Sequence, residues 1–280
     1  LTVNPVNDAP ILSFVEDLIF EEDGTGSVIL LASDIDSSDL LYSVSGGSSI
    51  QASITDNVVV FTPSPDYNGS EEFMAAVTDG EYSVSQSFNV TIIPVNDAPV
   101  IASIADQAID EDQSLSLDLS ASDVDGDILT FSASSDNGDV VVDGSSLTVT
   151  PGQDFNGSIL VDISVTDGSE TDSTSFTLTV NPVNDAPVLG ALSDGTTDED
   201  VDFTLTLTGS DVDGDDLTYF AQVDGNGSAS VDGTALTVSP AADYNGDIEV
   251  TITVSDGQVG DSSSFTLTVI PVNDAPVIAS

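Results

Sequence analysis

The six residues Pro-Val-Asn-Asp-Ala-Pro occur four times in this chain and divide it into units of nearly equal length. The copies begin at residues 5, 94, 182 and 271, so successive copies are 89, 88 and 89 residues apart. A fixed period of this size is typical of tandem repeats in which each copy forms one structural unit. We therefore predict three repeats, at residues 5–93, 94–181 and 182–270, followed at residues 271–280 by the truncated start of a further repeat.

Each repeat contains short runs in which apolar and polar residues alternate, the pattern of a strand with one buried face. In the second repeat, Leu115, Leu117 and Leu119 share one face, and Val100–Ile104 precedes them. Further runs follow at residues 129–133, 140–142, 147–149, 159–165 and 176–180. Seven strands in each unit predict an all-β fold of seven-stranded Greek-key sandwiches of the immunoglobulin type. The two prolines of each connector restrict the backbone, so we expect the three sandwiches to stand end to end.

The charge balance restricts the partners of this chain. It has 50 Asp and Glu residues and no Lys, Arg or His, for a formal net charge of −50. Two carboxylates about 5 Å apart repel by roughly 3 kcal/mol at an effective dielectric constant near 20, and no side-chain cation is present to offset this. Clustered acids therefore need metal cations from solution. We expect no nucleic-acid partner and, without a long apolar run, no membrane insertion.

The residue types that are missing select the metal. The chain has no Cys and no His, which removes thiolate and imidazole ligands, cysteine nucleophiles and Ser-His-Asp triads. The remaining ligands are oxygens, which favour hard cations such as Ca²⁺. Paired carboxylates can also hydrolyse glycosides, but here the acids recur at repeat boundaries and no cleft is indicated. We predict that this region is not an enzyme.

Five acidic or amide motifs recur at the same places in every repeat. An acidic pair precedes the second strand, an Asp-x-Asp follows it, an Asp-aromatic-Asn-Gly precedes the sixth strand, an Asp-Gly follows it, and Asn-Asp lies in the connector. Because successive strands run in opposite directions, motifs before the second and sixth strands lie at one end of a sandwich and motifs after them lie at the other. Acids from two successive repeats therefore converge on each connector.

These positions give a predicted set of Ca²⁺ ligands at every boundary. At the first junction, between repeats 1 and 2, the ligands are Glu22, Asp66, Asn96, Asp97, Asp123, Asp125 and Asp167. At the second junction, between repeats 2 and 3, they are Glu111, Asp154, Asn184, Asp185, Asp211, Asp213 and Asp256. The outer connectors have partial sets: Asn7, Asp8, Asp34, Asp36 and Asp79 before repeat 1, and Glu199, Asp243, Asn273 and Asp274 after repeat 3.

These motifs resemble those of cadherin repeats, and most closely the bacterial cadherin-like repeats found in tandem arrays in large secreted adhesins. The resemblance covers all three repeats. It implies cadherin-like sandwiches, Ca²⁺ held between successive domains by the residues just named, and contacts between adjacent repeats of the same chain. It also implies a structural or adhesive role outside the cell, at the bacterial surface.

Two alternatives stay open. The chain could be a module that binds cell-surface glycans or a partner cadherin-like domain, or it could be a spacer in a secreted polysaccharide-degrading enzyme. Aromatic rings occupy one position in each repeat, at Tyr67, Phe155 and Tyr244, where we expect them to close a corner of the sandwich rather than to stack on sugars. An EF-hand does not fit, because the sixth and twelfth positions counted from Asp123 are Ile128 and Ser134.

Overall fold

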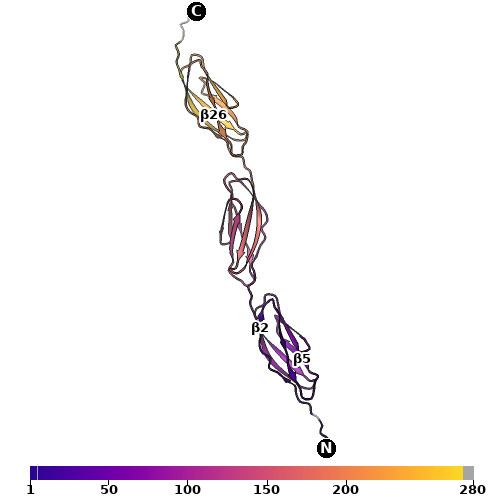
Figure 1. Cartoon of the computed structure of the whole chain (residues 1–280). Coiled ribbons are helices and arrows are strands. Elements are labelled where there is room, and N and C mark those ends of the chain that lie inside the picture. The colour runs from indigo at the N-terminus through magenta and orange to yellow at the C-terminus, as the bar shows by residue number, and fades with distance from the viewer. Residues whose placement is uncertain (5, 274–280) are drawn as a thin grey trace, which may run out of the picture.

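The computed structural model describes residues 1–4 and 6–273, and these form 27 strands and no helix. It follows that no helix long and apolar enough to cross a membrane occurs in this part of the chain. Figure 1 shows three separate β bodies in a line, joined by thin connectors, with the two termini at opposite ends. The prediction of an all-β chain of tandem sandwiches is confirmed.

Repeat 1 is built from nine strands in three sheets. The four-stranded sheet has the order β2-β9-β8-β5, the three-stranded sheet the order β3-β7-β6, and β1 pairs with β4. If β1 and β2 are counted as one strand divided between two sheets, and β3 and β4 as another, the nine elements correspond to seven strands. Their bounds are β1 Ile11–Leu12, β2 Leu18–Glu21, β3 Gly26–Ile29, β4 Ala32–Ser33, β5 Leu41–Gly46, β6 Ile50–Thr55, β7 Val58–Pro63, β8 Gly69–Thr78 and β9 Ser83–Ile93.

Repeats 2 and 3 have the same sheet orders as repeat 1. In repeat 2 the strands are β10 Val100–Ile101, β11 Gln107–Asp110, β12 Leu115–Asp118, β13 Ala121–Ser122, β14 Thr130–Ser135, β15 Asp139–Asp143, β16 Ser146–Thr150, β17 Gly157–Thr166 and β18 Thr171–Asn181. In repeat 3 they are β19 Val188–Leu189, β20 Gly195–Asp198, β21 Phe203–Thr206, β22 Gly209–Ser210, β23 Thr218–Val223, β24 Gly227–Asp232, β25 Ala235–Pro240, β26 Gly246–Ser255 and β27 Gly260–Ile270.

The first strand of each repeat differs from the sequence prediction. We expected one strand over Val100–Ile104, but β10 ends at Ile101 and the chain crosses to the other sheet as β11. There β11 runs parallel to β18, with Ile109 opposite Val180. Asp106, just before β11, accepts a hydrogen bond from the Thr177 N–H at 2.8 Å and so fixes this register. The crossing interrupts the apolar alternation, which is why the pattern did not indicate β11.

Each repeat has its own hydrophobic core between its sheets, and the three cores share no residue. In repeat 1 the core contains three phenylalanines, of which Phe61 and Phe73 meet edge to face with ring centroids 5.0 Å apart. Burying one such side chain contributes about 2–3 kcal/mol. The repeats are therefore separate bodies, and their relative orientation depends on the connectors.

The corner position predicted for the repeated aromatic residue is confirmed. Tyr67, Phe155 and Tyr244 are partly buried, and each packs against the core of its own repeat. The Tyr244 hydroxyl donates a hydrogen bond to the backbone carbonyl of Asp247 at 2.8 Å. The rings thus pack on their own sandwiches, as expected for corner residues.

One carboxylate in repeat 1 anchors the loop between β5 and β6. Glu71 accepts hydrogen bonds from the Ser48 hydroxyl at 2.6 Å and from the backbone N–H groups of Ser48, Ser49 and Ile50 at 3.0 Å each. Partial desolvation raises the pKa of this carboxyl, but the hydrogen bonds outweigh it and lower the pKa from 4.5 to about 2. Because the pKa is lower in the folded state, the stabilisation is complete above about pH 4.5 and is lost as the pH falls toward 2.

Replacing Glu71 with Gln should therefore cost about 1 kcal/mol near pH 7, a modest value because the site is partly exposed. The cost should disappear in chemical denaturation measured near pH 2. Glu72→Gln, an exposed neighbour with the same change in charge, is the control and should have little effect. A pH-independent cost at Glu71 would show that its charge does not hold the loop.

Candidate metal centres at the repeat junctions

The connector of the first junction, residues 94–99, is held by side chains from both neighbouring repeats. The Val95 N–H donates to Glu22 of repeat 1 at 2.8 Å. From repeat 2, Asp125 accepts the Asp97 N–H at 2.8 Å and Asp167 accepts the Asn96 side-chain amide at 2.9 Å. Acids of both repeats thus meet at this connector, as the strand directions indicated.

The second junction repeats this arrangement. The Val183 N–H donates to Glu111 of repeat 2. From repeat 3, Asp213 accepts the Asp185 N–H and Asp256 accepts the Asn184 amide, both at 2.8 Å. One contact has no counterpart among the hydrogen bonds of the first junction: the Gln258 amide donates to the side-chain oxygen of Asn184.

The glutamate that begins each acidic pair is deeply buried. Glu22 and Glu111 are 3% exposed and Glu199 is 7% exposed, and these are the buried polar side chains of the described residues. Glu22 Oε1 accepts the Val95 N–H, whereas its Oε2 is buried with no hydrogen-bond partner. A buried carboxylate oxygen without a partner is costly, and a cation bound at this position would offset that cost.

Four further buried carboxylate oxygens lack a hydrogen-bond partner in the described part of the chain. They are Oδ2 atoms of Asp34, Asp97, Asp123 and Asp211. All four belong to the predicted ligand sets, as Glu22 does. Oxygens that hydrogen bonds leave unsatisfied are the donors a hard cation requires, so the residues present fit Ca²⁺.

Two groups of closely spaced carboxylate oxygens lie at the second junction. Oxygens of Glu111, Asp185 and Asp213 lie within 4.8 Å of one another, and so do those of Asp112, Asp154 and Asp185. Asp185 belongs to both groups, so its carboxylate can be shared between two neighbouring cation positions. At the first junction, Asp123, Asp125 and Asp127 form a third such group.

The convergence of carboxylates raises the pKa of the aspartate in each connector between two repeats. Desolvation raises the pKa of Asp97, and the charges of Asp23, Asp66, Asp125 and Glu22 raise it further. Desolvation likewise raises the pKa of Asp185, and Asp154, Asp213, Asp112 and Glu111 add to the effect. The like charges come from both neighbouring repeats. Without a cation, each connector aspartate is thus destabilised in its charged form.

The aspartate of the Asp-Gly motif has a lowered pKa, in contrast to the connector aspartates. Hydrogen bonds from the Glu170 N–H, the Asn96 amide and the Ser169 N–H lower the pKa of Asp167. Comparable hydrogen bonds, from Tyr82, Glu81 and Asn7, lower the pKa of Asp79. The pKa of Asp256 is lowered in the same way, and the largest contribution comes from the hydrogen bond that the Asn184 amide donates. These carboxylates are held charged beside the connector and orient its asparagine.

The predicted ligand sets omitted two residues that the structure brings into the sites, Asp112 and Asp127. Asp112 is the second member of an acidic pair of which we predicted only the glutamate. Its backbone φ is 61°, and Asp154, which contacts it through a backbone N–H, has φ 53°. Non-glycine residues in this left-handed region are uncommon.

The same strained geometry marks one end of every repeat. Seven non-glycine residues of the described chain have positive φ, and six are aspartates of the acidic pair or of the Asp-aromatic-Asn-Gly motif. They are Asp23, Asp66, Asp112, Asp154, Asp200 and Asp243. Glycine would adopt this backbone at no steric cost, so the retained carboxylates favour a role for the side chains.

The outer connectors show the partial sites that one neighbour can supply. Before repeat 1, Asp36 accepts the Asp8 N–H and Asp79 accepts the Asn7 amide, both at 2.8 Å. After repeat 3, Glu199 accepts the Val272 N–H at 2.6 Å. Asp243 lies beside Asp200, to which its N–H donates at 3.3 Å. Asn273 ends the described part of the chain, and the predicted ligand Asp274 lies outside it.

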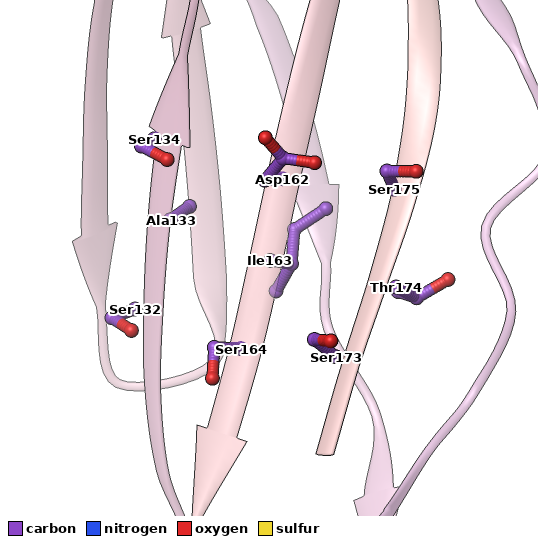
Figure 2. A pocket seen from close by; sticks show the side chains of 9 residues that line it. All are labelled: Ser132, Ala133, Ser134, Asp162, Ile163, Ser164, Ser173, Thr174 and Ser175. Atoms are coloured by element: carbon purple, nitrogen blue, oxygen red, sulfur yellow. The ribbon is translucent and has the colours of Figure 1, made fainter. Parts of the chain in front are cut away.

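An open hollow of about 460 Å³ lies on the outer face of the four-stranded sheet of repeat 2. Figure 2 shows Asp162 on β17 between Ser134 of β14 and Ser175 of β18. The other lining side chains are Ser132, Ala133, Ile163, Ser164, Ser173 and Thr174, so Asp162 is the one carboxylate among them. Paired carboxylates, as glycoside hydrolysis requires, are not found there.

Comparison with known proteins defines the class of the chain as tandem immunoglobulin-like domains. Residues 7–92, 96–181 and 184–270 each match a family described as Bacterial Ig domain. The chain belongs to this bacterial immunoglobulin-domain family. The matched segments cover all three repeats, which confirms the prediction of tandem bacterial repeats with an immunoglobulin-like fold.

Individual known proteins are similar to part or most of this chain. Chitinase A of Pseudoalteromonas piscicida is 32% identical over 105 residues, which is 36% of this chain and 13% of the chitinase. Among solved structures, PcdhgB3 EC1-4 has a TM-score of 0.54 at 16% identity, covering 96% of this chain and 77% of that one. Drosophila N-cadherin EC1-4 has a TM-score of 0.45 at 16% identity, with coverage of 96% and 76%. The structural likeness concerns the fold, and the chain spans about an eighth of the length of the chitinase.

Proposed function

We propose that this chain is a calcium-stiffened structural and adhesive region of an extracellular bacterial protein. The observation that carries the proposal is the set of buried carboxylate oxygens without hydrogen-bond partners, which lie at the connectors of a chain with no Lys, Arg or His. These oxygens need positive charge, and the chain cannot supply it. Oxygen-only ligands from aspartate, glutamate and asparagine suit Ca²⁺.

The residues that would hold the ions come from both sides of each connector. At the second junction, Glu111, Asp112 and Asp154 belong to repeat 2, Asp213 to repeat 3 and Asp185 to the connector. A bound Ca²⁺ supplies positive charge that offsets the mutual repulsion of these carboxylates. Because the ligands belong to two bodies and their linker, binding is coupled to the order of the junction.

Calcium affinity of extracellular modules is typically in the range of about 10⁻⁴ to 10⁻³ M, near the concentration outside cells. The junctions would then be ordered outside the cell and looser at the much lower free calcium of the cytoplasm. This dependence is the basis for placing the protein at the cell surface or in the medium. The bacterial immunoglobulin-like fold supports the same location.

A second candidate function is a spacer within a secreted polysaccharide-degrading enzyme. The match to a segment of chitinase A favours it, since that segment is a small part of a much longer enzyme. Both functions use repeats with stiffened junctions. They differ in the kind of domain that adjoins the repeats in the full-length protein. The sequence adjoining these repeats in the full-length protein distinguishes them: a catalytic domain supports the spacer, and further repeats ending in a binding domain support the adhesive role.

Two matched substitutions test the calcium proposal. Asp125→Asn and Asp213→Asn keep an oxygen that can accept the Asp97 and Asp185 N–H groups but remove one charge from one junction each. Each should weaken calcium binding at its own junction by about tenfold or more and leave the other unchanged, as resolved by calorimetric titration. Equal loss at both junctions in either variant would contradict local sites.

A further inference from the structure

Repeat 1 exposes four apolar side chains at positions that are small or polar in the other two repeats. Phe14, Ile29, Leu31 and Val58 are between 37% and 80% exposed. The equivalent residues are Ser103, Asp118, Ser120 and Ser146 in repeat 2, and Ala191, Thr206, Thr208 and Ala235 in repeat 3. Scattered apolar residues are normal on a surface, whereas contiguous ones are a feature of interaction sites.

Backbone pairing places Ile29, Leu31 and Val58 side by side, and Phe14 directly follows the residue that is hydrogen-bonded to Leu31. Ile29 of β3 pairs directly with Val58 of β7, and Val28 and Val59 beside them face the core. Leu31 lies two residues beyond Ile29 on the same outward face, with Leu30 buried between them. The Leu31 carbonyl accepts the N–H of Ser13, the residue before Phe14.

Two more exposed residues continue the surface. Ile11 pairs with Ser33, and it lines the same hollow as Ile35. We call Phe14, Ile29, Leu31, Val58, Ile11 and Ile35 the apolar strip. Exposed apolar patches on soluble proteins commonly mark interaction sites.

Repeats 2 and 3 show whether the fold itself requires apolar residues at these positions. The backbone hydrogen bond from Ser13 to Leu31 recurs from Ala102 to Ser120 and from Gly190 to Thr208. The pairing of Ile29 with Val58 likewise recurs between Asp118 and Ser146 and between Thr206 and Ala235. The same backbone is thus built twice with polar or small residues at the positions of Phe14, Ile29, Leu31 and Val58, and folding alone does not explain these four apolar side chains. The positions of Ile11 and Ile35 differ in this respect, because exposed valines occupy them in both other repeats.

The charges around the apolar strip indicate the chemistry of its partner. Exposed Glu16 lies two residues after Phe14, and exposed Asp56 lies two residues before Val58. Neither acid belongs to a junction site, so the proposed calcium ions do not neutralise them. A surface that packs on the strip must face these carboxylates, and it is favoured if it carries cations of its own.

We propose that the apolar strip of repeat 1 is a docking site for another protein that presents apolar side chains framed by Lys or Arg. A second copy of this chain is a poor occupant, because it would bring the same uncompensated carboxylates against each other. The six residues of the strip are few compared with the roughly 20–30 residues that each side of a stable interface contributes, which points to a weak, reversible contact.

The test uses two charge-neutral exchanges between repeats. In the depleted variant, Phe14→Ala, Ile29→Thr, Leu31→Thr and Val58→Ala install the residues of repeat 3. In the grafted variant, Ala191→Phe, Thr206→Ile, Thr208→Leu and Ala235→Val are added to the depleted chain. The probes are two fluorescent strand peptides, one alternating Leu with Lys and one alternating Ser with Lys, followed by anisotropy in about 0.15 M salt with calcium.

The Leu-Lys peptide should bind the original chain about tenfold more tightly than the depleted variant. The grafted variant should recover part of this difference, because repeat 3 then has the four apolar side chains but has Ser193 and Gly233 in place of Glu16 and Asp56. The Ser-Lys peptide should bind all three chains alike, since only charge attracts it. Equal binding of the Leu-Lys peptide to the original and depleted chains would overturn the proposal. Strip-dependent dimerisation in sedimentation equilibrium would also overturn it, in favour of a second copy. Circular dichroism melting confirms that each variant is folded.

Discussion

Calcium at about ten times its dissociation constant should raise the melting temperature of the repeats by about 5–10 °C. One ion bound only to the ordered junction contributes about 1.4 kcal/mol at that concentration. For domains of this size, 1 kcal/mol corresponds to about 4–8 °C. The expected rise follows from the unsatisfied oxygens of Glu22 and Asp97 and from the shared position of Asp185. Differential scanning calorimetry with calcium and with chelator measures it.

Two controls separate site binding from general screening. Sodium chloride at matched ionic strength reduces repulsion among all 50 acids but supplies no ligand-specific bonds. Magnesium has the same charge as calcium but demands tighter octahedral geometry and gives up its water reluctantly. Calcium should therefore stabilise more than either. An equal rise with sodium chloride would show that the acids act only as a diffuse charge.

Replacing Glu22 with Gln should change the free energy of unfolding in opposite directions without and with calcium. Glu22→Gln keeps an oxygen that can accept the Val95 N–H but replaces the buried, unpartnered Oε2 with a neutral group. Without calcium, the variant should be more stable than the original by about 1 kcal/mol, because a buried charge among like charges is removed. With saturating calcium, it should be less stable, because a ligand of the first junction is lost.

Glu111→Gln is the matched variant at the second junction, where Glu111 is equally buried and accepts the Val183 N–H. Each variant should lose the calcium response of its own junction. Chemical denaturation of the original chain and of both variants, with and without calcium, provides the six free energies of unfolding that the comparison needs. A Glu22→Gln chain less stable under both conditions would indicate that Glu22 is a packing residue rather than a ligand.

The period of the connector and the alternating apolar residues were sufficient to predict the architecture. They predicted three sandwiches, the strands of each core and the convergence of acids on Asp97 and Asp185, because strand direction follows from strand count. The parallel strand β11 escaped prediction. It is short, and a crossing between sheets replaces the alternation that would reveal it.

Some residues of the second junction could not be predicted from the spacing of motifs along the sequence. Asp112 has a left-handed backbone and its carboxylate lies beside those of Asp154 and Asp185, and no sequence period reports a dihedral angle or a side-chain contact. The contact of Gln258 with Asn184 is likewise a matter of side-chain reach. A combined search for acidic pairs before strands and for aspartates at turn positions would have found Asp112.

The central claim is that calcium at the junctions fixes the relative orientation of the repeats. Small-angle X-ray scattering of the chain, titrated from chelator to millimolar calcium, tests this most directly. We predict that the maximum dimension increases with calcium toward the length of the extended arrangement in Figure 1, and that Asp125→Asn and Asp213→Asn together abolish the change. The same maximum dimension with and without calcium would contradict it.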